Sequence, residues 1–293
     1  MKSTGFIWKG IRHYRSAYWG VLAGAAVGAM VLLGALMAGD SVQESLTKSA
    51  ELRIGKVAKI FSGGERFFCD DLAGRNGGSA MIYLKGQVNV EERAEGQVQV
   101  MGVSEDFWDF APQENSVDLS NFEAAISGPL ARALDLEEGD SAVVRLQKPG
   151  LLSRDAPLSG ESESVSSMRI TVAKILSDEE FGRFSLEQTQ VPPSSVFVPL
   201  KRLQKVLDLK GKANALLLDE DESFDPEKLE LADYGISVVE VPDGVEVRSE
   251  RIFMEPRIAD KIEGEPVLTY LINTLATEAG ETPYSMVTAV SGK

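Results

Sequence analysis

The sequence predicts an α+β protein with one N-terminal transmembrane helix, a stalk helix and then a mixed extracytoplasmic domain. Three observations lead to this prediction. Residues 17–38 carry no charged side chain, basic residues precede this segment while acidic ones follow it, and strand-like and helix-like runs alternate from about residue 56 onward. A hydrophobic share of 43% in 293 residues is sufficient for a large core. We therefore expect a folded domain attached to a membrane anchor.

Residues 17–38 have the length of a membrane span. As an α-helix they would extend about 33 Å, and the hydrocarbon core of a bilayer is about 30 Å thick. The alternatives are a cleaved signal peptide and a buried helix of a globular protein. A signal peptide has an apolar part of about 7–15 residues and a cleavage site with small residues, whereas the best candidate site, residues 36–38, begins with Leu36. We interpret the segment as a retained transmembrane helix.

Residues 1–16 are predicted to form an amphipathic elbow on the cytoplasmic surface. They hold four basic residues and no acidic one, while the rest of the chain has 26 basic against 45 acidic residues, a net charge of −19. Cations beside a span mark its cytoplasmic side, so residues after about 39 are expected outside the cytoplasm. The residues expected to anchor the chain at the membrane interface are Lys9, Arg12, Arg15, Trp8 and Trp19.

Three glycines recur at four-residue spacing within the span. Gly20, Gly24 and Gly28 lie on one face of a helix, where the lack of side chains allows another backbone to approach closely. The alternative is that they reflect the general frequency of glycine in membrane helices. If the face binds a helix, the partner is a second copy of the chain or helices outside this sequence, because no other stretch reaches 18 uncharged residues.

The helix is expected to continue beyond the membrane as a stalk, residues 39–55. Val42, Leu46, Ala50 and Ile54 recur at intervals of four, and Gly55 is a natural helix stop. This pattern predicts a rigid rod between the membrane and the domain that follows.

The domain at residues 56–293 is predicted to mix short helices with strands. Pro129 is expected in the first turn of a helix that Gly139 ends, and Pro199 separates a strand from a helix with Leu200, Leu203 and Leu207 on one face. Residues 149–167 are rich in Ser, Gly and Pro and predict a surface loop or hairpin excursion. The expected strands are 57–61, 80–90, 96–103, 141–146, 168–176, 196–199, 214–218 and 235–241.

A helix that Asp225 and Pro226 begin is expected between the last two of these strands. The resulting strand, helix, strand series resembles half of a split βαβ unit.

The residues that enzymes commonly use are scarce. His13, the only histidine, precedes the span, so no imidazole is available outside as a base or metal ligand. Cys69 is the only cysteine, so a metal site with several cysteine ligands is excluded. Asp70 and Asp71 beside it disfavour the thiolate, which indicates a structural thiol. A phosphate-binding loop is missing, and the acidic body disfavours nucleic acid as a partner. We expect no catalytic residue, cofactor or metal, and the protein is not predicted to be an enzyme.

The acidic segment at residues 219–230 has a spacing reminiscent of a calcium loop. The candidate ligands are Asp219, Asp221, Ser223, Asp225 and Glu230, but Phe224 occupies the position at which the sharp turn needs glycine. A solvated acidic turn that caps a helix is the alternative we favour. Residues 177–184 are likewise expected to form a turn and not a carboxylate site.

An ordered series of segments resembles the start of an FtsX-like, MacB-type ABC transporter permease. The resemblance runs through the elbow, GDSVQESL, RIGKV, GERFF, ISGPLARALDLEEGDSAVVRL, FGRFSLEQTQVPPSSVFVPLKRLQKVLDLKGKANALLL and TPYSMVTAV. It covers nearly the whole chain. It implies a βαβ-type porter subdomain, with halves at about 56–110 and 206–285, interrupted by a β-rich insert at about 111–205.

The resemblance also implies a function. Members of this family work as dimers of permease protomers with a separate cytoplasmic ABC ATPase, and they export or extract a lipid, lipoprotein or peptide, or activate an external partner. This sequence lacks the later transmembrane helices of the family, so we expect a fragment or a split gene. The main alternative is a complete single-span anchored protein that binds a ligand or acts as an adaptor. An extracytoplasmic enzyme is a third alternative, which the missing histidine disfavours.

Overall fold

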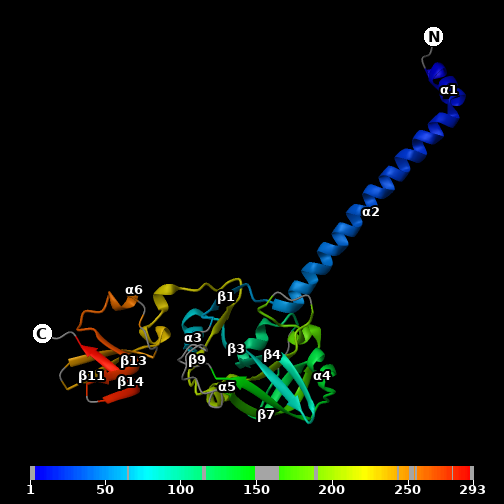
Figure 1. Ribbon diagram of the computed structural model, residues 1–293. Helices are drawn as coiled ribbons and strands as arrows, with labels where there is room; N and C mark the ends of the chain where they lie inside the picture. The colour runs from blue at the N-terminus through cyan, green and yellow to red at the C-terminus, as the bar shows by residue number, and fades with distance from the viewer. Residues whose placement is uncertain are drawn as a thin grey trace. The chain divides into compact units, whose positions relative to one another are not determined.

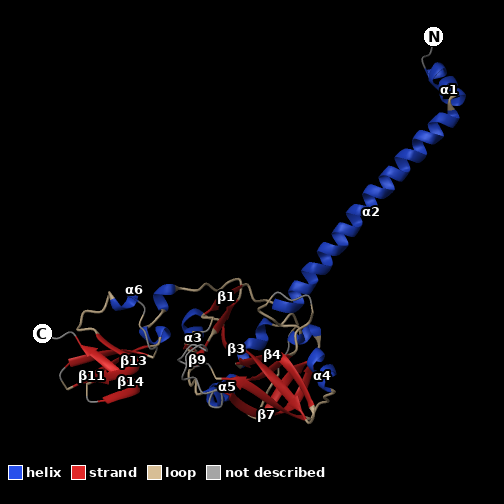
Figure 2. Cartoon of the chain, in the orientation of Figure 1, coloured by secondary structure: helices blue, strands red, loops and turns tan. Residues whose placement is uncertain are grey.

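The computed structural model describes most of the chain. The described residues are 4–64, 66–113, 117–148, 165–187, 191–242, 244–250, 254, 256–278 and 280–290. The chain folds as two compact units, Met1–Arg53 and Ile54–Lys293. Helix occupies the first unit, and strands dominate the second (Figure 2).

The described part of the first unit consists of the helices α1 and α2 (Figure 1). α1 spans Thr4–His13, and α2 spans Arg15–Ile54, 40 residues. At about 1.5 Å per residue α2 is about 60 Å long, so the predicted span and stalk are parts of one rod. The sequence allows this continuity because no proline precedes Pro112. No residue of α2 is buried, and α2 is the one helix in the described part that is long and apolar enough to cross a membrane.

The second unit is organised around an eight-stranded sheet. Its strand order is β1-β10-β3-β4-β8-β5-β7-β6. The strands, in chain order, are β1 Lys59–Ser62, β3 Ser79–Val90, β4 Arg93–Val103, β5 Glu123–Ser127, β6 Ser141–Gln147, β7 Val165–Leu176, β8 Ser195–Pro199 and β10 Ala215–Leu218.

Six of these strands close into a barrel. β3 pairs with β4 along one side and with β6 along the other, so the ring runs β3-β4-β8-β5-β7-β6 and returns to β3. β3 is long enough to pair with both β10 and β6: Ser79–Met81 pair with β10, and Gly86–Asn89 pair with β6. The register between β3 and β4 shifts between Gly86 and Val88, where β4 has one extra residue and therefore a bulge. Glycine is required at position 86 of β3, since a Cβ there would lie 2.7 Å from the carbonyl oxygen of Arg145.

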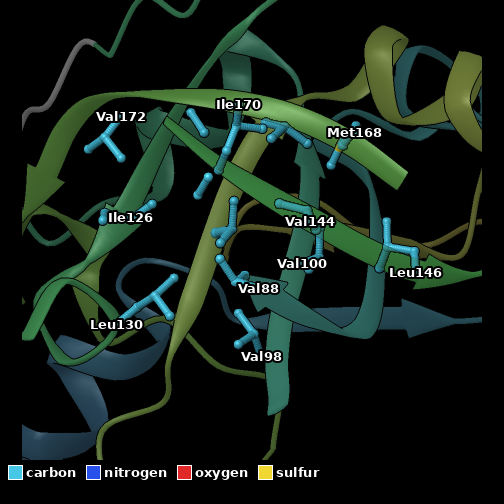
Figure 3. Close-up of a cluster of buried hydrophobic side chains, with 14 of the residues drawn as sticks. Val88, Val98, Val100, Ile126, Leu130, Val144, Leu146, Met168, Ile170 and Val172 are labelled. Atoms are coloured by element: carbon cyan, nitrogen blue, oxygen red, sulfur yellow. The ribbon is translucent and has the colours of Figure 1, made fainter. Parts of the chain in front are cut away.

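Alternating side chains fill the barrel. In β6, Ala142, Val144 and Leu146 are buried while Ser141 and Arg145 are exposed, the period of two expected for a strand with one buried face. α4 (Gly128–Leu134) and α5 (Leu200–Leu207) add leucines to the same cluster, so that it is a packed core and not a channel. Figure 3 shows Val88, Val98, Val100, Ile126, Leu130, Val144, Leu146, Met168, Ile170 and Val172 of this core.

Two further cores pack against the sheet. The first is aromatic and is built by η1 (Glu105–Phe110) and η2 (Asp178–Gly182) together with Phe197 of β8. The second is smaller and joins α3 (Leu72–Asn76) to the short pair β2 (Phe68–Cys69) and β9 (Lys212–Ala213). The last two-stranded sheets are the hairpins β11 (Ile236–Val241) with β12 (Gly244–Ser249) and β13 (Val267–Thr277) with β14 (Gly280–Val290). The remaining helical turns are η3 Pro226–Lys228, η4 Leu231–Tyr234 and α6 Pro256–Ala259.

Most predicted strands are confirmed, but one helix end is wrong. Pro129 lies in the first turn of α4 as expected, yet the helix ends at Leu134, where Asp135 adopts a left-handed conformation and its N–H bonds back to Ala131. Asp can take this conformation because its short side chain tolerates positive φ. Gly139 belongs instead to the turn before β6. Of the predicted excursion, residues 149–164 lie outside the described residues, and β7 begins at Val165.

The predicted strand, helix, strand series after residue 214 is also corrected. The helix expected after Asp225 is only the 3-10 turn η3, because Leu229 is extended and Glu230 starts a second capping box with Asp233. Acidic side chains here bond backbone N–H groups locally and compete with helix propagation. β10 and β11 lie in different sheets, and β11 pairs antiparallel with β12. This stretch therefore contains no βαβ unit.

Candidate functional site

The residues predicted to meet the membrane all lie in the first unit. Trp8, Lys9 and Arg12 are on α1, while Arg15 and Trp19 are near the start of α2. All five side chains are exposed, and the two indoles are 74% and 69% exposed. Aromatic rings and cations at one end of an apolar helix are the arrangement found at membrane–water interfaces. Their role as anchors stays a prediction.

The three glycines of the span lie in the uninterrupted part of α2. Gly20, Gly24 and Gly28 are exposed, and no atom outside the helix's own turns lies within 4 Å of the Cβ that each could carry. At 100° per residue they occupy an arc of about 80° on one side of the helix. The structure thus leaves a smooth strip of backbone open, and whether a helix packs on it stays a prediction.

The part of α2 beyond the span is amphipathic. Val42 and Leu46 lie on the side of the helix that carries the glycines, and both are exposed. The polar residues on the opposite side are Asp40, Gln43, Glu44, Thr47, Lys48 and Glu51. A helix with this division is suited to water on one side and a packing partner on the other.

The segment that follows α2 is fixed to the second unit, and we call residues Gly55–Val57 the attachment segment. The Lys56 N–H donates to the carbonyl oxygen of Phe110 at 2.8 Å, and its ammonium donates to the carbonyl oxygen of Asp109 at 3.1 Å. Val57 is buried at 5% exposure. The attachment segment is therefore held by backbone hydrogen bonds and by packing, two constraints that a flexible linker lacks.

Gly55 is required at its position for two reasons. Its φ is +56°, a conformation that side chains disfavour. A Cβ would also lie 2.1 Å from the carbonyl oxygen of Phe110 and 2.9 Å from the ring of Phe181. The sequence predicted Gly55 as a helix stop, and the structure adds a close approach to the aromatic core.

The aromatic core behind the attachment segment is a cluster of rings that sequence reasoning missed. The Phe107 ring lies 5.1 Å from the rings of Trp108, Phe181 and Phe184, with the edge-to-face geometry that aromatic pairs favour. Phe181 has a φ of +71°, which costs backbone energy and is held by complete burial. The sequence feature that could have indicated this cluster is the presence of two or more aromatic residues in each of two acidic segments, EDFWDF and DEEFGRF. Their spacing follows neither a helical nor a strand period.

The acidic segment 219–230 uses its carboxylates to bond backbone amides. Asp219 Oδ1 accepts from the N–H groups of Asp221 and Glu222 at 2.9 Å each. Glu222 reaches across to the N–H of Gly78 at 2.7 Å, and Asp225 caps η3 by accepting from Glu227. These bonds fit the acidic turn that we favoured over a calcium loop.

Cys69 lies beside a buried ion pair. The Asp233 carboxylate, with a side chain 1% exposed, lies 3.0 Å from the Arg75 guanidinium and accepts from the Cys69 N–H at 3.1 Å. Cys69, Asp71 and Asp233 bring a thiol and two carboxylates within 4.8 Å of one another, but both carboxylates are paired with Arg75. Burial raises the pKa of the Cys69 thiol, and Asp233 and Asp71 raise it further against the opposing effect of Lys212. A raised pKa disfavours the thiolate, which is the direction that the sequence indicated.

Comparisons with known proteins give structural likenesses only. No protein-family model and no curated protein matches the chain. Among solved structures, the extracellular domain of the noncanonic ABC-type transporter YknZ from Gram-positive bacteria is 14% identical, with a TM-score of 0.34 over 55% of this chain and 74% of that one. The periplasmic region of MacB from Actinobacillus actinomycetemcomitans is 9% identical, with the same TM-score and the same two coverages.

A domain of a permease protein from Porphyromonas gingivalis is also similar. It is 11% identical, with a TM-score of 0.31 over 67% of this chain and 77% of that one. These three structures are an extracellular domain, a periplasmic region and a domain of a permease protein.

Proposed function

We propose that the chain is a membrane-spanning permease subunit of an ABC transporter, or a fragment of one. In this proposal residues 1–16 lie in the cytoplasm, α2 crosses the inner (plasma) membrane, and the second unit lies outside. The observation that carries the proposal is α2 itself, which is 40 residues long, apolar over residues 17–38, amphipathic beyond Asp40 and unburied throughout. So much unburied apolar surface requires lipid or other helices around it.

The proposed action is mechanical. A separate cytoplasmic ABC ATPase would move the membrane helices as it hydrolyses ATP, and α2 would carry that displacement to the attachment segment. An uninterrupted helix transmits displacement along its axis because its backbone hydrogen bonds resist bending. The attachment segment receives it through the bonds of Lys56 to Phe110 and Asp109. The second unit would then change conformation to export or extract a lipid, lipoprotein or peptide.

The helix partner of the proposed permease would lie on the strip of Gly20, Gly24 and Gly28. A second permease protomer or further transmembrane helices would supply it, and close backbone approach would stabilise the packing. The division of the second unit into porter halves at about 56–110 and 206–285, with an insert at about 111–205, also stays a prediction. In the barrel, β3 and β4 come from the first of these ranges and the other four strands from the insert.

ATP hydrolysis that co-purifies with the chain tests the proposed function. The full-length protein is isolated from its own membranes in mild detergent, and vanadate-sensitive ATP hydrolysis is measured. The chain itself has no phosphate-binding loop, so we expect activity only from an associated ATPase. A triple variant with Gly20, Gly24 and Gly28 changed to Leu should lose most of this activity because added side chains separate the helices.

The matched control adds bulk to the far side of the same helix turns. A variant with Ala25→Leu, Ala26→Leu and Ala29→Leu should retain the co-purifying activity, since these positions lie about 100° to 160° away from the centre of the glycine strip. A membrane-inserted wild type that brings no ATP hydrolysis would contradict the proposal and favour a single-span adaptor.

A further inference from the structure

The second unit has an apolar groove between α3, η1 and the start of α5. Its volume is about 540 Å³, within the range of sites that hold a few amino-acid side chains. Ala80, Val103, Trp108, Val117 and Leu200 line it, and each is less than 9% exposed. These side chains form an apolar floor that is continuous with the aromatic core.

The charged residues that line the groove are mostly acidic. Glu105, Asp106 and Asp118 are exposed and take part in no ion pair among the described residues, while Asp70 accepts a hydrogen bond from Gln204 at 2.8 Å. Lys201 is the one cation in the lining. The groove thus combines an apolar floor with carboxylates that outnumber the single cation in its lining. An apolar ligand that carries positive charge complements both features.

An exposed aromatic side chain follows directly in the chain after a residue that lines the groove. Asn121 lines it, and the next residue, Phe122, is 72% exposed. The Arg202 guanidinium lies 4.7 Å from the centre of the Phe122 ring and also donates to the carbonyl oxygens of Asn121 and Arg169. An exposed aromatic ring stacked by an arginine that is itself held by two carbonyls is the kind of side chain that anchors protein ligands.

We propose that this groove binds a basic, apolar peptide segment of a partner protein. Apolar side chains of the segment pack on Trp108 and Val117, and its Lys or Arg side chains reach the carboxylates of Glu105, Asp106 and Asp118. A peptide fits better than a small organic cation because Phe122, which follows the lining residue Asn121, offers an exposed apolar side chain outside the groove. The inference concerns the second unit alone and holds for a permease and for an anchored adaptor alike.

Tryptophan fluorescence of the full-length chain tests this inference. Trp108 is the only tryptophan of the second unit, so Trp8→Phe and Trp19→Phe leave a single reporter in the groove. The probe is a short acetylated peptide of alternating Lys and Phe, titrated into the protein in non-ionic detergent. An equally long peptide of alternating Glu and Phe and the small cation pentylammonium are titrated in parallel. We expect saturable binding of the basic peptide only.

Matched variants locate the binding. Gly74 lines the groove, is exposed and has open space for a side chain. Gly74→Leu should therefore fill the groove and lower the affinity for the basic peptide about tenfold. Gly96→Leu, at an exposed and open position on β4, should bind like the wild type. Asp106→Asn with Asp118→Asn should weaken binding about fivefold at low salt and less at high salt, since screening reduces their contribution. Glu92→Gln with Glu137→Gln should leave it unchanged.

Three results would overturn the proposal. The first is that the acidic peptide binds as tightly as the basic one. The second is that Gly74→Leu and Gly96→Leu bind the basic peptide with equal affinity. The third is that pentylammonium binds as tightly as the basic peptide, which would show that the site takes a small amine. Because Gly74 has an ordinary backbone conformation and open space, a folded variant is expected, and near-ultraviolet circular dichroism of Trp108 checks it.

Discussion

Replacing Gly55 by alanine should lower the free energy of unfolding of the second unit by about 3 kcal/mol. Two separate costs contribute. A side chain at the observed φ of +56° is strained by about 1–2 kcal/mol, and the new Cβ would lie 2.1 Å from the Phe110 carbonyl oxygen. The carbonyl cannot move away freely because it accepts the hydrogen bond of Lys56. The measurement is urea denaturation followed by Trp108 fluorescence.

Gly64 provides a matched control for Gly55→Ala. Its φ is +64°, nearly the same as that of Gly55, but no atom lies within 4 Å of its Cβ position. Gly64→Ala should therefore lower the free energy of unfolding only by the strain, about 1–2 kcal/mol. Equal free energies of unfolding for the two variants would show that Gly55 does not closely approach the aromatic core. The proposed route from α2 into the second unit would then also be wrong.

Replacing Asp233 by alanine should also cost about 3 kcal/mol. The loss leaves the Arg75 guanidinium, whose side chain is 21% exposed, without its buried partner, and it removes the acceptor of the N–H groups of Cys69 and Glu230. Breaking a buried pair from one side is costly because the other charge stays desolvated. Thermal or urea unfolding of the variant measures the effect.

Asp71→Ala is the control variant that distinguishes the effect of burial from the effect of ion pairing. It lies 3.0 Å from the same arginine, the same distance as Asp233, but its side chain is 66% exposed. Asp71→Ala should therefore cost under about 1 kcal/mol, as expected for a surface ion pair. Equal losses for Asp71→Ala and Asp233→Ala would show that the packing of η4 against α3 does not depend on the buried carboxylate.

Elements with a strong local period could be predicted from the sequence. α2 follows from its apolar composition and the lack of proline, and α5 follows from the spacing of Leu200, Leu203 and Leu207, all of which are buried. β3, β4 and β7 follow from apolar alternation bounded by glycine and polar turns. In each case the information lies within one segment of the chain.

The barrel and the aromatic core could not be predicted in this way. Closure depends on β3 pairing with β6, and the parallel pairs β4–β8 and β5–β7 join segments far apart in the chain. Nothing in the pattern of one strand specifies its neighbour. Phe107 and Phe181 likewise lie in separate acidic turns and meet only in the folded state. The helix expected after Asp225 failed because acidic side chains capped successive turns instead of extending one.

The central claim is that residues 17–38 cross a membrane and hold the second unit on the far side. Cysteine labelling in intact spheroplasts tests it most directly. Cys69 is partly buried and burial raises the pKa of its thiol, so the experiment replaces it by serine and adds one exposed cysteine, either Ser16→Cys or Glu137→Cys. With a membrane-impermeant maleimide, Glu137→Cys should be labelled at once and Ser16→Cys only after permeabilisation. The opposite pattern, or recovery of the chain in the soluble fraction without detergent, would contradict the account.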